Sequence, residues 1–451
     1  MRILPHLSAA ATALIISLLG PAPASPAAET LETAIRKMLE YEPELRASAW
    51  DAVSVRHDQK VVRGEMLPQV NISGSGGLYE RDRSLDGLEA STSGPLFSRQ
   101  LGVTARQLLW DFGAANSRNN SAKARARMQA LMESAHAESR AVDMVEVFLE
   151  VLRLREQIRL SEANLAQHRK VATAMQDRFE QGGDRADLAL VQGRLELSKT
   201  DLETQKLALE HAVGRYKRLT GREPGELQKP GIPRIPDHRN RIDLSANWYV
   251  LASREAIEMA EETRKAEQKE GGPKLFAEGG YSVGQDVLGI EGQDNEARAL
   301  VVLSWNIIDG GRNVHRAKRG IALEKKAHEL HKAANAEQRY QAGLLLSELE
   351  GAKNTIDALE EYSTRLKQVS SDYDEQFELG KRDILSILDV QNEQHSAQSR
   401  LVDATYEEIA SRYRLLGLQG YLVSGLIGER KNSGRHIEVD GGLFKKPKTK
   451  E

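Results

Sequence analysis

Two histidines three positions apart, His328 and His331, are the residues whose type could most readily bind a metal ion. Zinc sites on a helix use the spacing H-E-x-x-H, which places two imidazoles on one face beside a third ligand. The stretch reads HELH instead, and the sequence around it offers no third ligand. The pattern therefore predicts a solvated helix face.

No other stretch has the pattern of a catalytic site. The sequence lacks a phosphate-cradling glycine loop, a nucleophile elbow and a cluster of metal ligands, so we predict a protein that is not an enzyme and needs no cofactor. The formal net charge is -3, and without a basic excess a nucleic-acid partner is not expected. The chain has no cysteine, which excludes disulfides, thiolate chemistry and a lipidated N-terminal cysteine.

Charged residues gather in two related stretches, RFEQGGDRADLALVQGR at 178–194 and YDEQFELGKRDILSILDVQNEQ at 373–394. Each stretch is expected to end one helix, turn at glycine and start another. Asp187 and Asp383 would lie near the N-termini of the returning helices, where negative charge is favourable, so capping explains them as well as a functional role does. Asp389 lies further into its helix, where this explanation weakens.

The first residues have the features of a secretory signal. Arg2 supplies a positive charge, residues 7–19 an apolar segment and Ala22-Pro23-Ala24 a cleavage site. A membrane anchor is the alternative, but the apolar run falls short of the ~20 residues that a bilayer requires. We predict that residues 1–28 are a signal peptide and that the chain is exported. No later segment is apolar enough for a transmembrane helix, so a membrane-spanning part would consist of strands.

The chain consists of two similar halves. An offset of 198 positions aligns matching residues: Val103 with Val301, Asp111 with Asp309, and Gly113 with Gly311. Such a pattern indicates an internal duplication. The predicted organisation is a first repeat over 29–221, a proline-rich linker over 222–242, a second repeat over 243–428 and a polar C-terminal tail over 429–451.

Each half has the same order of elements: a helical stretch, two strands joined by a polar loop, a long helix and a shorter returning helix. In the first half these are expected over 31–65, 69–79, 101–109, 114–179 and 186–220, with the loop over 80–98. In the second half the first helical stretch is expected over 244–269, the strands over 274–283 and 299–307, their loop over 284–296, and the returning helix over 383–420.

The long helix over 114–179 would measure ~100 Å at 1.5 Å per residue. The two shorter helices of the same half would together match that length. Apolar residues of the long helix form two seams two positions apart, which at about 100° per residue lie on nearly opposite sides. The first seam contains positions 142, 145, 149 and 152, and the second contains 144, 147, 151, 154 and 158. Opposed seams predict a wall of helices side by side, because a solvated amphipathic helix would show one broad stripe.

The four strands cannot close a barrel within one chain, and open strand edges are not tolerated in lipid. Strands of about 9 to 11 residues can cross a bilayer at a tilt, and three chains would supply twelve. Aromatic residues expected near the strand ends fit an interfacial girdle: Tyr79, Phe97, Trp110, Phe112, Phe276, Tyr281 and Trp305. The predicted fold class is mainly α with a small transmembrane β portion.

Through the duplicated strand hairpins, the glycine turns and the Val-Gln pairs at 191–192 and 390–391, the mature chain up to residue 428 resembles the TolC family of outer-membrane efflux and secretion channels. The resemblance implies a homotrimer whose twelve-stranded β-barrel in outer-membrane lipid continues into a long α-helical barrel across the periplasm. It implies a periplasmic adaptor (membrane fusion) protein and an inner-membrane ABC or RND-type transporter as partners.

Within that family, the missing lipidated cysteine favours type I secretion over drug efflux. The alternative from another class is a periplasmic coiled-coil adaptor or structural protein, in which the alternating segments would form a soluble β domain.

The resemblance also implies roles for individual residues. It places Asp187, Arg382, Asp383, Ser386 and Asp389 at a pore aperture, where three copies of an acid would focus negative potential. Ser386 departs from the family, which has a second ring acid there, and Asp383 would substitute for it. The residues at the adaptor-docking tips would be Arg178, Phe179, Gly182, Gly183, Phe377, Gly380 and Lys381. The junctions between barrel and helices would contain Trp110, Asp111, Gly113, Asp309 and Gly311.

Overall fold

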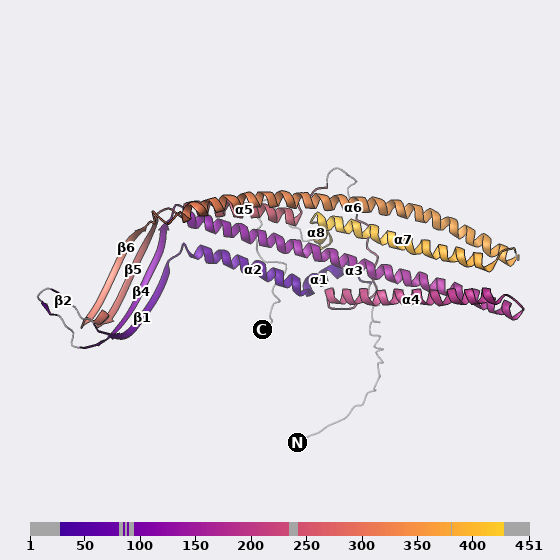
Figure 1. Cartoon of the computed structure of the whole chain (residues 1–451), viewed down its shortest axis with the longest axis horizontal. Coiled ribbons are helices and arrows are strands. Elements are labelled where there is room, and N and C mark those ends of the chain that lie inside the picture. Colours follow the sequence, from indigo (N-terminus) through magenta and orange to yellow (C-terminus); the bar gives the residue numbers. More distant parts are fainter. Residues whose placement is uncertain are drawn as a thin grey trace, which may run out of the picture.

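The computed structural model describes residues 28–80, 84–85, 88–89, 94–233, 242–379 and 381–427. Most of the predicted signal peptide, the polar tail, Gly380 and the middle of the proline-rich linker lie outside these residues. The described chain is an elongated bundle of helices with a β-sheet at one end (Figure 1).

Two long helices set the length of the molecule. α3 (Ala114–Glu180) and α6 (Arg312–Glu378) contain 67 residues each, or ~100 Å at 1.5 Å per residue. Shorter helices lie along them (Figure 1): α2 (Pro43–Gly64) and α4 (Arg185–Thr220) along α3, and α5 (Trp248–Lys269) and α7 (Ile384–Leu418) along α6. The expected stacking of two shorter helices beside each long one is confirmed. None of the described helices is both long and apolar enough to cross a membrane.

The single helical stretch expected over 31–65 is wrong in one respect, because it consists of two helices. α1 (Leu31–Tyr41) ends before Glu42, whose backbone is extended, and Pro43 is the first residue of α2. Proline disfavours the helical conformation in the residue before it and has no N–H to donate, so the helix cannot continue through Glu42. The break lets α1 pack Ile35 and Met38 into the core beside α3.

Four strands form one antiparallel sheet in the order β1-β4-β5-β6, namely β1 (Gln69–Tyr79), β4 (Leu96–Trp110), β5 (Lys274–Gln285) and β6 (Gln293–Ser304). β4 pairs with β5 and so joins the two halves. A short pair, β2 (Ser84–Leu85) with β3 (Leu88–Glu89), lies in the connection between β1 and β4, and a 3-10 turn, η1 (Val287–Gly289), follows β5 and contacts β4 and β1. Among the described residues no α-helix covers either face of the sheet, and Ile72 is 70% exposed.

Four of the expected strand boundaries are wrong. β4 begins at Leu96, inside the segment predicted as a loop, and the turn between β5 and β6 occupies only residues 286–292. β6 ends at Ser304, three positions before the expected end at 307. As a result Tyr281 lies within β5, opposite Val103 and Ala297, rather than at a strand end. Polar composition indicated loops here, but backbone pairing between neighbouring strands extends the hairpins regardless of side-chain polarity.

The interior contains two separate apolar clusters. The larger one joins α1, α3, α4 and α7 through residues such as Met144, Phe148, Tyr216 and Ile409. The smaller one lies near the far end of α3, around Met175, and includes residues of α4 and α7. Residues of both predicted seams of α3 are buried, and α3 packs against α4, α5 and α7. The prediction of neighbours on more than one side of α3 is confirmed.

Candidate functional site: the two ends of the helical bundle

The turn between α3 and α4, at the end of the bundle far from the sheet, is built from two glycines. Gly182 has a φ of 98°, a left-handed conformation that favours glycine, and the N–H of Gly183 donates to the carbonyl of Arg178 at 3.0 Å. A Cβ on Gly183 would lie 2.9 Å from that same carbonyl oxygen. Both positions predicted from the glycine phrase therefore shape the turn itself.

The capping explanation for the two tip acids is only partly right. The residue that caps α4 is Asp184, whose carboxylate accepts from the N–H of Ala186 at 2.7 Å, and Asp187 lies in the first turn behind it. Asp383 holds the N-cap position of α7, but its side chain makes no capping hydrogen bond. Asp187 and Asp383 therefore do not act as hydrogen-bonding caps. Each can still interact favourably with the dipole of its helix, because both lie near a helix N-terminus.

The second turn is joined to the first by the smaller apolar cluster. Phe377 packs against this cluster, whereas Phe179 of the first turn is exposed. The guanidinium of Arg382 lies 3.8 Å from the centroid of the Tyr373 ring, an attractive cation–π arrangement. Within the described chain no hydrogen bond or ion pair joins Arg382 to Asp187.

Asp389 has a partner that the sequence did not reveal. Its Oδ1 lies 2.7 Å from Nη2 of Arg194, which comes from α4, while Ser386 lies half-buried one turn earlier on α7. Nothing in the linear sequence connects positions 194 and 389, because the two helices belong to different repeats. The signal that could have suggested the pair is that both residues lie soon after the glycine turn of their own repeat.

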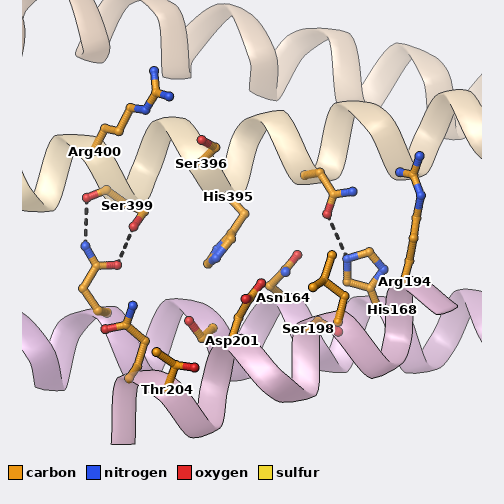
Figure 2. Close-up of a pocket in the computed structure, with 15 residues that line it drawn as sticks. Asn164, His168, Arg194, Ser198, Asp201, Thr204, His395, Ser396, Ser399 and Arg400 are labelled. Carbon is orange, nitrogen blue, oxygen red and sulfur yellow. Dashed lines mark hydrogen bonds between the residues drawn. The ribbon is translucent and has the colours of Figure 1, made fainter. Parts of the chain in front are cut away.

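Between the two apolar clusters lies a polar cavity of about 510 Å³, lined by α3, α4 and α7 (Figure 2). His168 of α3 is 1% exposed; its Nε2 lies 3.1 Å from Oδ1 of Asn392. Its Nδ1 has no hydrogen-bond partner among the described residues. Figure 2 shows His395 reaching from α7 toward Asp201. The tip is thus separated from the main core by a layer in which polar contacts replace apolar packing.

Burial sets the protonation of both cavity histidines. It lowers the pKa of His168 below its ordinary value, and the positive charge of Arg194 acts in the same direction. Burial also lowers the pKa of His395, and the attraction of Asp201 does not offset it. Both imidazoles therefore favour the neutral form.

At the opposite end of the bundle, two equivalent junctions connect strands to the long helices. Asp111 accepts from the N–H groups of Gly113 and Ala115 at 3.1 and 2.6 Å. Asp309 accepts from the N–H groups of Gly311 and Asn313 at 3.0 and 2.8 Å. These bonds satisfy N–H groups that the first helical turn leaves free.

Both junction glycines, Gly113 and Gly311, are left-handed, with φ of 81° and 82°. The sequence alignment of the two halves therefore corresponds to the same local geometry.

The first junction contains a residue that the sequence did not single out. Arg118 of α3 lies 3.1 Å from the carboxylate of Glu65 and 3.7 Å from that of Asp111, and it also pairs with Glu270. It therefore ties the end of α2, the start of α3 and the end of α5 together below the sheet. Trp110 and Phe112 lie against one another here, with ring centroids 3.7 Å apart.

Comparison with known proteins supports this architecture. The family described as outer membrane efflux protein matches residues 34–222. The outer membrane efflux protein BepC of Brucella suis biovar 1 (strain 1330) is 23% identical over 73% of this chain and 73% of its own length. The outer membrane protein TolC of Vibrio cholerae serotype O1 (strain ATCC 39315 / El Tor Inaba N16961) is 21% identical over 86% of this chain and 90% of its own.

Among solved structures, the outer membrane protein VceC from Vibrio cholerae has the same fold, with a TM-score of 0.77 at 13% identity. The alignment covers 86% of this chain and 96% of that one.

Proposed function

Since the chain belongs to the outer membrane efflux protein family, we propose that it is the exit duct of a tripartite export system, spanning the outer membrane and extending into the periplasm. The observation that carries this proposal is the open four-stranded sheet at the end of ~100 Å helices. Within the described sheet, β1 pairs only with β4 and β6 only with β5, so each outer strand has one free edge. A free edge in a membrane must be paired, and a second copy of the same sheet can pair it.

Three copies of the chain would give twelve strands, an even number as bacterial outer-membrane barrels have. Each strand has 11 to 15 residues, enough to cross a bilayer at a tilt. The helices support the same assembly, because α6 carries large exposed apolar side chains along its length: Leu330, Tyr340, Leu344 and Tyr362. A neighbouring protomer would bury them and continue the wall of helices into a closed α-helical barrel.

The tips are the proposed contact with a periplasmic adaptor protein, which would connect the duct to an inner-membrane ABC or RND-type transporter. The exposed Phe179 and Lys381 offer an apolar and a charged contact beside the glycine turn. Asp389 and Asp383, which are exposed, would form the aperture in three copies together with the half-buried Asp187, Arg382 and Ser386.

The proposed cargo is protein, as in type I secretion, which rests on the resemblance described from the sequence. Small-molecule efflux is the second candidate, favoured by the Brucella suis relative, which is named an efflux protein. The duct itself would serve both, since cargo is selected by the pump and the adaptor. Loss of secretion of one protein from a deletion strain, with unchanged drug susceptibility, would support the first candidate; the reverse result would support the second.

Membrane fractionation tests the duct against a periplasmic adaptor or structural protein. We expect the mature protein in the outer-membrane fraction, resistant to alkali, and running as a heat-modifiable trimer on gels. Release of a monomer by high salt or alkali would contradict the proposal, because a peripheral protein has no strands in lipid.

A further inference from the structure

We propose that Glu261, Glu324 and His328 bind a divalent transition-metal ion of the zinc class, which would link α5 to α6. Their ligand atoms, two carboxylate oxygens and one imidazole nitrogen, all lie within 4.8 Å of one another. This site is separate from the tips and the junctions and does not depend on the proposed export function.

The backbone brings the ligands together. Glu324 and His328 are four residues apart on α6 and so lie on the same face of the helix. Glu261 comes from α5, which packs against α6. Close approach of the two helices nearby is possible because residue 320 is glycine: a Cβ there would lie 3.0 Å from Cα of Arg264.

The ligand types select the class of metal. Zinc is bound by imidazole nitrogen and carboxylate oxygen at about 2.0–2.2 Å, and three protein ligands leave a fourth position for water. Calcium and magnesium prefer six or more oxygen ligands, which one imidazole and two carboxylates do not provide. Tetrahedral zinc with ligands at about 2.0–2.2 Å holds them roughly 3.4 Å apart, so the three side chains would have to rotate from their present separations of up to 4.8 Å.

The ligands are available to a cation. Among the described residues, Glu261 and His328 form no hydrogen bond and no ion pair, although Glu261 is half-buried. Glu324 is paired with Arg264 through Oε2, which leaves Oε1 for the metal and orients the carboxylate. Two carboxylates and one guanidinium leave a net charge of about -1 at the site, which favours a cation.

The HELH stretch is largely the solvated helix face that the sequence predicts, since His328, Glu329 and Leu330 are exposed and His331 is half-buried. His331 is not the partner of His328, because its Nδ1 lies 2.7 Å from Oγ of Ser253 and its Nε2 lies 3.1 Å from Nδ2 of Asn335. The ligands beside His328 come from one turn earlier on α6 and from a different helix. A spacing search along the sequence could not find the ligand on α5.

Titration of the purified full-length protein with Zn²⁺, followed by calorimetry, tests the site. We expect one ion per chain, and we expect His328→Ala to lower the affinity for Zn²⁺ at least ~10-fold. Mutation of a residue that only hydrogen-bonds to a metal ligand already lowers metal affinity about 10–100-fold, and His328 would be a ligand itself. His315→Ala is the matched control, because His315 is an exposed histidine of α6 outside the cluster, and it should bind as the unaltered chain does. Millimolar Ca²⁺ or Mg²⁺ should not compete.

Two further measurements show whether weaker binding reflects loss of a specific metal site, rather than unfolding of the variant or nonspecific binding to its surface. Glu261→Gln should also weaken binding while the helical circular dichroism spectrum stays unchanged, and bound Cu²⁺ should show coupling to one imidazole nitrogen in its electron paramagnetic resonance spectrum. Equal Zn²⁺ affinity in His328→Ala and the unaltered chain, or weakening by His315→Ala to the same extent, would overturn the proposal.

Discussion

Asp389 of α7 and Arg194 of α4 form an ion pair with 2.7 Å between Oδ1 and Nη2, and it joins the two helical hairpins just above their tips. The carboxylate remains 65% exposed, so it can still act on a passing ion. In a trimer, three arginines would accompany three acids, and the potential at the aperture would depend on both residues.

Opposite effects are therefore expected from the two partners in planar-bilayer recordings. Asp389→Ala should weaken block of the channel by multivalent cations, because the acid is lost. Arg194→Ala should strengthen block up to about fivefold, since an exposed pair is worth up to ~1 kcal/mol. Arg215→Ala, which breaks a pair with Glu150 elsewhere on α4, is the control. Unchanged block in Asp389→Ala would remove Asp389 from the aperture.

The first tip should not tolerate a side chain at Gly183. Gly183→Ala places a methyl group 2.9 Å from the carbonyl oxygen of Arg178, and such overpacking costs about 1–3 kcal/mol. Gly193→Ala, in the interior of α4 with open space around it, should instead stabilise the chain slightly. Hydrogen exchange of the backbone around the turn measures both, and equal exchange in the two variants would show that the turn absorbs the methyl group.

The junctions should depend on their aspartates. Asp309→Ala removes the acceptor of two backbone N–H groups and should cost about 0.5–2 kcal/mol. Asp309→Asn keeps one oxygen and should lose less. Thermal unfolding ranks the variants, and a stability of Asp309→Ala equal to that of the unaltered chain would mean that water replaces the carboxylate at no cost.

Lowering the pH should destabilise the fold around the polar cavity that contains His168 and His395. Burial lowers the pKa of His168 and of His395 below the ordinary value of 6.5, so the unfolded chain binds more protons than the folded one as pH falls past that value. Their contribution to stability is complete above pH 6.5 and is lost as pH falls through the folded pKa. The other charged groups facing the cavity are Arg194, Asp201 and Arg400; Arg194 opposes protonation of His168, and Asp201 favours protonation of His395 without offsetting burial.

Thermal unfolding at pH 7.5 and 5.5 measures this effect. The fall in Tm should be smaller in the double variant His168→Gln, His395→Gln than in the unaltered chain. His136→Gln, which changes an exposed histidine of α3, should behave as the unaltered chain does. An equal fall in Tm in all three proteins would place the acid sensitivity elsewhere.

The sequence predicted those features that depend on neighbouring residues. Repetition of Asp111 and Gly113 as Asp309 and Gly311 predicted two equivalent junctions, because the turn uses only local backbone groups. The seams of α3 likewise predicted its neighbours, since burial follows helical periodicity. The limits of β4 were missed, because strand pairing depends on a partner and not on composition alone.

Contacts between repeats could not be predicted in this way. Arg194 with Asp389, and Glu261 with His328, involve helices that approach only in the folded chain. Arg118 likewise pairs with Glu65 and Glu270, which lie far from it in the sequence. Each of these pairs depends on the relative rotation of two helices, which a period within one helix does not determine.

Closure of one sheet by three chains can be tested directly by cross-linking the free edges of β1 and β6. The chain contains no cysteine, so introduced cysteines cannot react with native ones. One cysteine would replace Ser73 of β1, and a second would be placed at successive positions of β6 in separate variants. For one register of β6 we predict oxidation to covalent dimers and trimers, with no product larger than three chains. A closed trimer would be contradicted if no position of β6 gave a cross-link, or if gels showed cross-linked products of more than three chains.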